Sequence, residues 1–179
     1  LVVGSSWPTE EKLVKNCILP PNWKVVIAPH EINSDRLNAI ASLYGDSIRY
    51  SESTLDDIES ASVLVVDNVG MLSKIYQHAD LAVIGGGFGK GVHNTLEAAA
   101  WGVPMIVGPN NFKFKEIQDM RVRGALAKVR TQADFDNAVV DLIARKSEAG
   151  TSAADYVKEK AGATRRITDQ LLTVNVHQA

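Results

Sequence analysis

The chain alternates short apolar runs with segments of helical period, and this pattern constrains the fold more than any other feature. Nearly continuous apolar runs are typical of parallel strands that are buried on both faces of a sheet. We therefore expect an α/β fold, a Rossmann-like parallel sheet with helices on both faces. The expected strands are Leu1–Val3, Lys24–Ala28, Ser47–Tyr50, Val63–Asp67, Leu81–Ile84, Pro104–Val107 and Leu126–Val129.

Helical segments are expected between these strands. They lie near Thr9–Ile18, Ser34–Tyr44, Met71–His78, Asn94–Trp101, Phe114–Arg123 and Ala133–Arg145. A longer amphipathic pattern from about Ala153 to Val174, with Tyr156, Val157, Ile167, Leu171 and Leu172, predicts a last helix that packs across the sheet or reaches toward another domain. We take residues 1–179 as one domain, because the length is typical of a single domain and no repeat or linker interrupts it.

The composition limits the classes of function. A hydrophobic share of 45% with 22% charged residues indicates a globular chain, and no apolar run approaches the roughly 18 residues that span a bilayer, so we expect a soluble domain. The net charge is -2 and no basic stripe is interleaved with aromatic residues, which argues against nucleic acid as a partner. A single cysteine, Cys17, excludes an internal disulfide and favours a reducing, cytoplasmic environment.

The beginning of the sequence predicts that the chain is a piece of a longer protein. Leu1 opens directly into the apolar run LVVGSS, with no initiator methionine, charged leader or cleavage site before it. We therefore expect part of the chemistry to lie outside these residues.

The carboxyl ends of the expected strands define where a ligand should bind, since open parallel sheets bind ligands in the crevice beyond those ends. The loops there are Gly4–Trp7, Pro29–Ile32, Asp67–Gly70, Gly85–His93 and Gly108–Lys115. One of them begins the stretch GGGFGKGVHNTLE, Gly85 to Glu97. Its spacing fits neither the Gly-x-Gly-x-x-Gly dinucleotide motif nor a P-loop, because Lys90 is followed by Gly91 and position 84 is isoleucine.

The glycines still predict an anion site. Backbone without Cβ atoms approaches a ligand closely, and a helix start that follows offers free N–H groups and a favourable dipole to a phosphate or carboxylate. The alternative is a tight strand-to-helix turn in which glycine serves packing alone.

A constellation of polar side chains follows the glycines. His93, Asn94 and Glu97 have the spacing of one helix face, so a carboxylate at Glu97 can accept from two vicinal hydroxyls, as on a ribose, while His93 and Asn94 lie nearer the anion. In the alternative, Asn94 is only an N-cap and Glu97 only a favourable charge on the helix dipole. The histidines His30, His78, His93 and His177 show no metal-ligand spacing, so no metal is expected.

The stretch from Asp67 to Glu116, with its HNTLEAAAWGVP and NFKFKE segments, resembles the C-terminal half of the bacterial 3-deoxy-D-manno-octulosonic acid (Kdo) transferases of lipopolysaccharide synthesis. The resemblance extends upstream to GSSWPTEE, Gly4 to Glu11, and more loosely to the end of the chain. It implies a GT-B glycosyltransferase, in which this chain is the nucleotide-sugar domain and the N-terminal acceptor domain lies outside it.

The resemblance also implies ligands, partners and location. The donor is CMP-Kdo, the acceptor is a lipid A precursor bound by the other domain, and that domain supplies the general base, so the resemblance places no catalytic residue here and implies no cofactor. The full-length enzyme works at the cytoplasmic face of the inner membrane, and only the whole protein associates with the membrane. Isolated, this domain is expected to be inactive.

The same resemblance assigns the donor contacts. The glycine loop, with Gly85, Gly86, Gly87 and Gly91, faces the CMP phosphate together with His93 and Asn94; Glu97 holds the ribose, and the backbone at Gly4, Ser5 and Ser6 lines the crevice. Ser5 and Ser6 are equally consistent with a local ST-turn. Asn111 or Lys113 is a further donor contact, Phe112 and Phe114 are expected to anchor their loop in the core, and Asn68 either borders the base pocket or caps the next helix.

The chain departs from the family pattern in two places. The family commonly has Pro-Arg-His-x-Glu after the second strand, whereas this chain has Ala28, Pro29, His30 and Glu31, so His30 either replaces the arginine or is a plain loop histidine. The glycine loop is one residue shorter than is usual, and Lys90 is its only cation. Lys90 either neutralises a phosphate or carboxylate or is an ordinary exposed lysine.

Two other classes of function remain open from the sequence. The first is a UDP-sugar transferase or a UDP-N-acetylglucosamine 2-epimerase-like domain. The second is a nucleotide-binding fragment without turnover.

Overall fold

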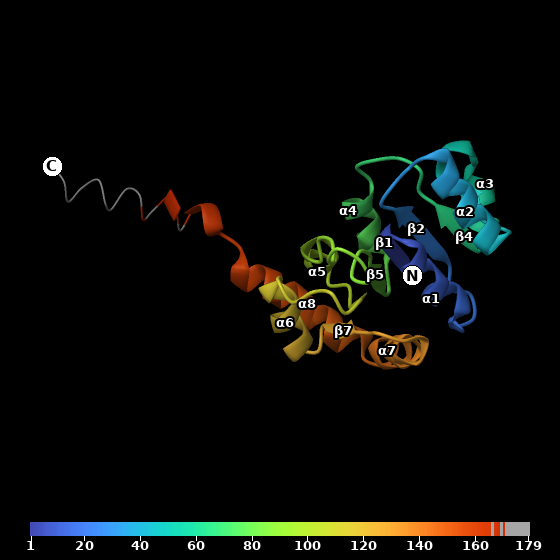
Figure 1. Ribbon diagram of the computed structural model, residues 1–179. Coiled ribbons are helices and arrows are strands. Elements are labelled where there is room, and N and C mark those ends of the chain that lie inside the picture. The colour runs from blue at the N-terminus through green and yellow to red at the C-terminus, as the bar shows by residue number, and fades with distance from the viewer. Residues whose placement is uncertain (166, 169, 171–179) are drawn as a thin grey trace.

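The computed structural model describes residues 1–165, 167–168 and 170. They form an α/β structure around one sheet of seven parallel strands in the order β3-β4-β2-β1-β5-β6-β7 (Figure 1). All seven expected strands are present, and the predicted fold class is confirmed. The strands are β1 (Val2–Ser6), β2 (Val25–Pro29), β3 (Ile48–Arg49), β4 (Val63–Val65), β5 (Ala82–Ile84), β6 (Met105–Val107) and β7 (Leu126–Lys128).

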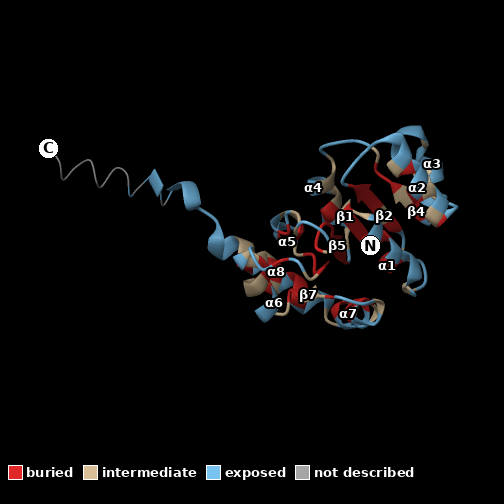
Figure 2. Cartoon of the chain, in the orientation of Figure 1, coloured by how far each residue is buried: buried red, intermediate tan, exposed pale blue. Residues whose placement is uncertain are grey.

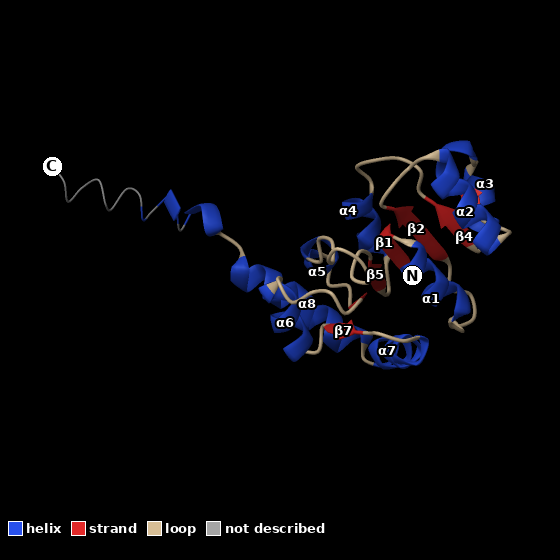
Figure 3. Ribbon diagram, viewed as in Figure 1, coloured by secondary structure: helices blue, strands red, loops and turns tan. Residues whose placement is uncertain are grey.

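Helices connect the strands (Figure 3). Those expected from the sequence correspond to α1 (Pro8–Asn16), α2 (Ser34–Tyr44), α4 (Leu72–Ile75) with the 3-10 turn η2 (Tyr76–His78), α5 (Leu96–Ala100), α6 (Lys115–Val122) and α7 (Gln132–Ala144). The 3-10 turn η1 (Tyr50–Glu52) and α3 (Leu55–Ser60) were not expected. Thr54 and Asp57 start α3 with a capping box, in which each residue's side chain accepts from the other's main-chain N–H.

The last predicted helix is wrong in its start and in its continuity. The helix α8 (Lys146–Lys160) begins before Ala153, and a break at Ala161 and Gly162 follows it. Tyr156 is buried and Val157 packs on the core as expected, whereas Ile167 is 58% exposed. Leu171 to Val174 lie outside the described residues. The segment after α8 leads away from the sheet (Figure 1).

Two buried clusters cover the two faces of the sheet, and side chains of successive strand residues alternate between them. The first cluster joins Val3, Ile27, Val83 and Ile106 to residues of α1, α2 and α7. The second joins Val2, Ile84, Met105 and Val107 to residues of η2, α5, α6 and α8. The central strands β1, β2 and β5 are therefore mostly buried on both sides (Figure 2), which explains their continuous apolar sequence.

The strand order reverses at the centre of the sheet. On one side of β1 the sheet continues through β2, β4 and β3, and after β4 the chain crosses to pair β5 on the opposite side of β1. In open parallel sheets such a switch point leaves a crevice beyond the carboxyl ends of the two central strands. The loops after β1, β2 and β5 meet there.

Candidate functional site

A cleft of about 570 Å³ opens beyond the carboxyl ends of β1, β2 and β5, at the switch point. Three segments form it: the start of α1 with the residue before it, the loop after β2, and the loop after β5, which we call the glycine loop (Gly85–Gly91). The lining residues are Trp7, Pro8, Thr9, Glu10, His30, Glu31, Gly86, Phe88, Gly89, Lys90, Gly91 and His93. The structure thus brings together His30, Gly86, Lys90, Gly91 and His93 of the predicted site residues.

Main chain packs on main chain behind the glycine loop. A Cβ atom on Gly85 would lie 1.9 Å from the carbonyl oxygen of Ser5, and one on Gly87 would lie 2.5 Å from the main-chain nitrogen of Gly108. Neither neighbour is a side chain that can rotate away. These two glycines are needed for packing, as the alternative interpretation of the sequence held, while Gly86 and Gly91 line the cleft itself.

The glycine loop also carries uncommitted N–H groups. Several of its carbonyls accept hydrogen bonds: Gly86 accepts from the amides of Gly89 and Gly91, and Gly87 accepts from the amide of Asn110. Within the described part of the chain, the main-chain N–H groups of Gly86, Phe88 and Lys90 have no main-chain acceptor. Unpaired amides beside a cleft are suited to an anion.

The predicted constellation of His93, Asn94 and Glu97 on one helix is wrong. The helix α5 begins at Leu96, so His93 and Asn94 precede it. Asn94 accepts from the Leu96 amide at 3.0 Å and donates to the Glu97 carboxylate at 2.9 Å, so local turn and capping bonds hold both side chains. His93 lines the cleft, and Asn94 and Glu97 do not.

Three stacked rings form one wall of the cleft. The ring centroids of Trp7 and His30 are 4.9 Å apart, and those of His30 and His93 are 4.3 Å apart. The Trp7 indole N–H donates to Nε2 of His93 at 3.4 Å, which requires that nitrogen to be unprotonated. Burial and the neighbouring His30 lower the pKa of His93. His30 stacks between the other two rings and remains exposed, and its replacement of the family arginine stays a prediction.

Glu10 is a residue of the cleft that the sequence reasoning missed. It is 1% exposed, and neither of its carboxylate oxygens has a hydrogen-bond partner within the described residues. Burial raises its pKa, although the nearby main-chain amides of Glu10, Gly86 and Trp7 act in the opposite direction without completing a hydrogen bond. Its sequence context gave no sign of a site, because acidic residues are common in the first turn of a helix, and Glu10 follows Pro8 there.

The neighbouring Glu11, in contrast, has partners on both its carboxylate and its main chain. Ser6 donates to its carboxylate at 2.6 Å, Arg36 of α2 forms an ion pair with it, and its carbonyl accepts from the Tyr44 hydroxyl at 2.9 Å. The Ser6 hydroxyl thus points into the protein, and it does not line the cleft. Ser5 has φ of 50°, at an irregularity in the pairing of β1 with β2.

The other predicted site residues lie outside the cleft. Gly4 faces Tyr76, whose hydroxyl oxygen would be 1.8 Å from a Cβ there. Asn111 is buried, donates to the Gly108 carbonyl at 2.8 Å and accepts from Gln118 at 2.9 Å. Lys113 is exposed.

Two further interpretations of loop residues are settled by burial and capping. Phe114 packs partly buried against the core as predicted, whereas Phe112 is 78% exposed, so the prediction that it anchors the loop is wrong. Asn68 is exposed, and the residue at the cap position of α4 is Met71, so Asn68 does not cap that helix.

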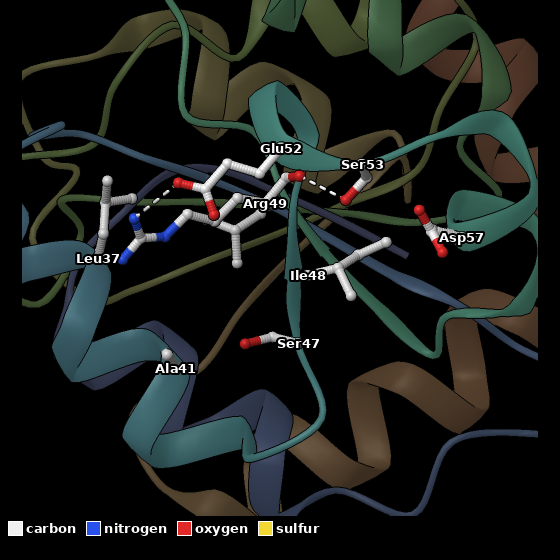
Figure 4. A pocket seen from close by; sticks show the side chains of 9 residues that line it. Leu37, Ala41, Ser47, Ile48, Arg49, Glu52, Ser53 and Asp57 are labelled. Carbon is white, nitrogen blue, oxygen red and sulfur yellow. Dashed lines mark hydrogen bonds and ion pairs between the residues drawn. The ribbon is translucent and has the colours of Figure 1, made fainter.

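A second cavity, of about 500 Å³, lies at the edge of the sheet beside β3 (Figure 4). We call it the edge cavity; its lining residues are Leu37, Ala41, Ser47, Ile48, Arg49, Glu52, Ser53, Asp57 and Val65. Its polar groups bind one another: Arg49 contacts Glu52 at 3.3 Å and Asn38 at 3.0 Å, and Ser53 donates to the Arg49 carbonyl.

The described part of the chain contains no group of three or more His, Cys, Asp or Glu side chains placed to hold a metal ion. No helix in that part has the length and apolar character needed to cross a bilayer.

Comparison with known proteins gives relatives of one kind. No protein-family model matches the chain. It is 37% identical over 114 residues to the 3-deoxy-D-manno-octulosonic acid transferase of Bordetella pertussis. The aligned residues make up 61% of this chain and 27% of that protein. It is 32% identical over 162 residues to the enzyme of the same name from Haemophilus influenzae. That alignment makes up 84% of this chain and 37% of that protein. The chain is related to the Kdo transferases.

The chain spans about a third of the length of these curated relatives. Among solved structures, it superimposes on the C-terminal CMP-Kdo binding domain of WaaA from Acinetobacter baumannii with a TM-score of 0.68 and 19% identity, over 87% of each chain. This likeness shows the fold, which is that of the C-terminal half of a GT-B glycosyltransferase. The predicted resemblance and the predicted architecture are both confirmed.

Proposed function

We propose that the cleft holds CMP-Kdo and that the chain is the donor-binding part of a Kdo transferase, which moves Kdo to a lipid A precursor in lipopolysaccharide biosynthesis. The observation that carries the proposal is a cleft lined by a glycine loop at the switch point of a chain whose relatives are Kdo transferases. Unpaired amides of that loop suit the phosphate of a nucleotide sugar.

The proposed donor contacts follow from the cleft. The N–H groups of Gly86, Phe88 and Lys90 and the Lys90 ammonium face the phosphate, and the wall of Trp7, His30 and His93 offers flat apolar surface to a ring of the ligand. The remaining contacts proposed from the family resemblance are Gly85, Gly87, Asn94 and Glu97, the last on the ribose. Charge that builds up on the departing CMP meets donors already in place, which lowers the barrier by preorganised electrostatics.

The rest of the reaction is proposed to lie outside this chain. Transfer to a sugar hydroxyl needs a general base and an acceptor site, and we propose that another domain supplies both. The whole enzyme is proposed to work at the cytoplasmic face of the inner membrane, where its lipid acceptor is made. We expect the chain alone to show no turnover with CMP-Kdo and a lipid A precursor.

Titration calorimetry tests the proposal with CMP, UDP and cytidine. We expect CMP to bind, UDP to bind more weakly, and cytidine to bind more weakly still, because it lacks the phosphate. Tighter binding of UDP than of CMP would favour a UDP-sugar enzyme instead. No heat from CMP at saturating concentration would refute the donor site.

The ribose contact has its own test. Glu97→Ala should weaken CMP binding, and 2′,3′-dideoxy-CMP, which lacks both ribose hydroxyls, should bind wild type and Glu97→Ala equally if the carboxylate holds those hydroxyls. Unchanged CMP affinity in Glu97→Ala would remove Glu97 from the site, as would an effect that persists with the dideoxy ligand.

A further inference from the structure

The buried carboxyl group of Glu10 lies in the cleft and has no role in the proposed function. It belongs to the first turn of α1, lines the cleft, and is 1% exposed. Both of its oxygens lack a hydrogen-bond partner within the described residues. A buried carboxyl without partners is costly to keep, so its retention beside a cleft points to a ligand.

The neighbours of this carboxyl identify the kind of ligand. The main-chain amides of Gly86 and Trp7 lie close to it, and Gly86 belongs to the loop whose free amides face the cleft. An anion bound on those amides therefore comes close to the Glu10 carboxyl. Two negative charges cannot share a water-poor site, and the group relieves the repulsion by taking a proton.

We propose that Glu10 is protonated when an anionic ligand occupies the glycine loop, and that it then donates a hydrogen bond to that anion. The step adds one proton from solvent to a carboxylate oxygen and changes no covalent bond of the ligand. It rests on the proposed function, since the anion is the phosphate or the sugar carboxylate of the donor. Glu10 thereby selects for an anion, because a ligand hydroxyl would be bound better by the carboxylate form.

The surroundings contain other groups that affect a proton at this position. Glu11 favours proton uptake by Glu10, and the charge of Glu11 is held by Arg36 and Ser6. His93 has a lowered pKa and accepts from Trp7. The charged and titratable groups that line the cleft or adjoin Glu10 in the described chain are Glu11, His30, Glu31, Lys90 and His93.

Proton uptake on CMP binding tests the proposal. Calorimetry in buffers of different ionisation enthalpy counts the protons taken up, from about pH 6 to 8.5. The phosphate of CMP itself titrates near about pH 6, so the informative quantity is the difference between wild type and Glu10→Gln. Above the pKa of Glu10 in the free protein, wild type should take up about one proton more per CMP than Glu10→Gln.

The affinities give a second readout. As the pH rises from 6 to 8.5, the affinity of wild type for CMP should fall by up to about tenfold for each pH unit above the pKa of free Glu10. In Glu10→Gln, the fall in affinity that is due to the Glu10 proton should be absent. Glu31→Gln is the matched control: Glu31 lines the same cleft but is exposed, so its replacement should leave the proton count as in wild type.

The outcomes separate the two proposals. CMP binding with equal proton uptake in wild type and Glu10→Gln overturns the role of Glu10 and leaves the donor site standing. Absence of CMP binding at every pH overturns both. If Glu10→Gln does not fold, the ¹³C shift of the Glu10 carboxyl in wild type decides: its pKa must rise on addition of CMP, and an unchanged or lowered value refutes the proposal.

Discussion

The cleft and the edge cavity are hollows of similar volume, about 570 and 500 Å³, but their polar groups are arranged in opposite ways. In the edge cavity, Arg49 and Glu52 bind each other and Asp57 forms a capping box with Thr54, so the charged side chains of the lining have partners. In the cleft, the carboxyl of Glu10 and several loop amides have no partner in the described chain. Size alone therefore does not mark a binding site, whereas polar groups left unpaired beside a hollow do.

The largest contrast is expected from glycine substitutions. Gly87→Ala should lower the free energy of unfolding by at least about 4 kcal/mol, because its Cβ would meet the main chain of Gly108 and neither side can rotate away. Near the edge cavity, Gly45→Ala should cost only about 1–2 kcal/mol, from its φ of 69°, since nothing lies within 4 Å. Urea denaturation measures both.

Gly89→Ala is the matched control within the glycine loop. Its Cβ would be 3.8 Å from the nearest atom, the Gly86 carbonyl oxygen, so we expect a change within about 0.5 kcal/mol. If Gly87→Ala is as stable as Gly89→Ala, the packing of main chain on main chain behind the cleft is not as described.

The next contrast compares the stability contributed by a buried ion pair, Arg36–Glu11, with that of an exposed one, Arg49–Glu52. Arg36→Ala should cost about 3 kcal/mol, because it leaves the 1% exposed side chain of Glu11 charged without its cation. Arg49→Ala at the edge cavity should cost less than about 1 kcal/mol, since its partner Glu52 is 67% exposed. Equal losses in thermal denaturation would show that burial does not separate the two regions.

The sequence predicted those parts of the fold that depend on local pattern. Buried strands such as β5 and β6 are recognisable because every residue in them is apolar. The helix α3 was missed because it buries no residue and therefore has no apolar period, although the Thr54 capping box marks its start. The start of α8 was missed because Gly150 and its polar neighbours read as a loop; a Cβ on Gly150 would lie 2.2 Å from the Gly102 carbonyl oxygen.

The sequence predicted where the candidate site lies, but it did not predict all of the residues that form it. The strand ends and the glycine stretch located the cleft, since both are properties of neighbouring residues. The stack of Trp7, His30 and His93 depends on three loops that the sheet order brings together, and no local pattern contains that order. Whether the oxygens of Glu10 are paired depends on the distant Gly86, so the sequence alone could not distinguish Glu10 from Glu11, whose carboxylate binds Ser6 and Arg36.

A third contrast concerns pH. Burial raises the pKa of Glu10, so the folded state resists its ionisation. Well below pH 4.5 the group is protonated in both folded and unfolded states and Glu10→Gln should have little effect through charge. As the pH rises through the pKa of folded Glu10, the wild type loses about 1.4 kcal/mol for each unit of the shift, and Glu10→Gln should not. Urea denaturation from pH 4 to 8 measures this.

Asp57 in the edge cavity should show the opposite dependence of stability on pH. In the edge cavity, the Thr54 main chain and hydroxyl donate to Asp57 and lower its pKa, so Asp57→Asn should lose stability relative to wild type above about pH 4. Glu10→Gln and Asp57→Asn should therefore diverge from wild type in opposite directions as the pH rises. A Glu10→Gln variant that is less stable than wild type at pH 8 by more than at pH 4 contradicts the burial of an unpaired carboxyl.

The smallest expected effect concerns Lys90, the one Lys or Arg side chain among the described residues that line the cleft. Its side chain is exposed, so Lys90→Ala should leave stability within about 0.5 kcal/mol of wild type. If its ammonium faces the donor phosphate, CMP affinity should fall by about two- to fivefold, as for a partly solvated charge at the rim of a site. The loss of affinity should shrink at about 1 M salt, where the Debye length is only about 3 Å.

Lys12 is an exposed lysine of α1 outside the cleft and serves as the control. Lys12→Ala should change neither the stability nor the CMP affinity. A loss of affinity in Lys90→Ala that does not respond to salt would indicate that Lys90 shapes the loop and does not act through its charge.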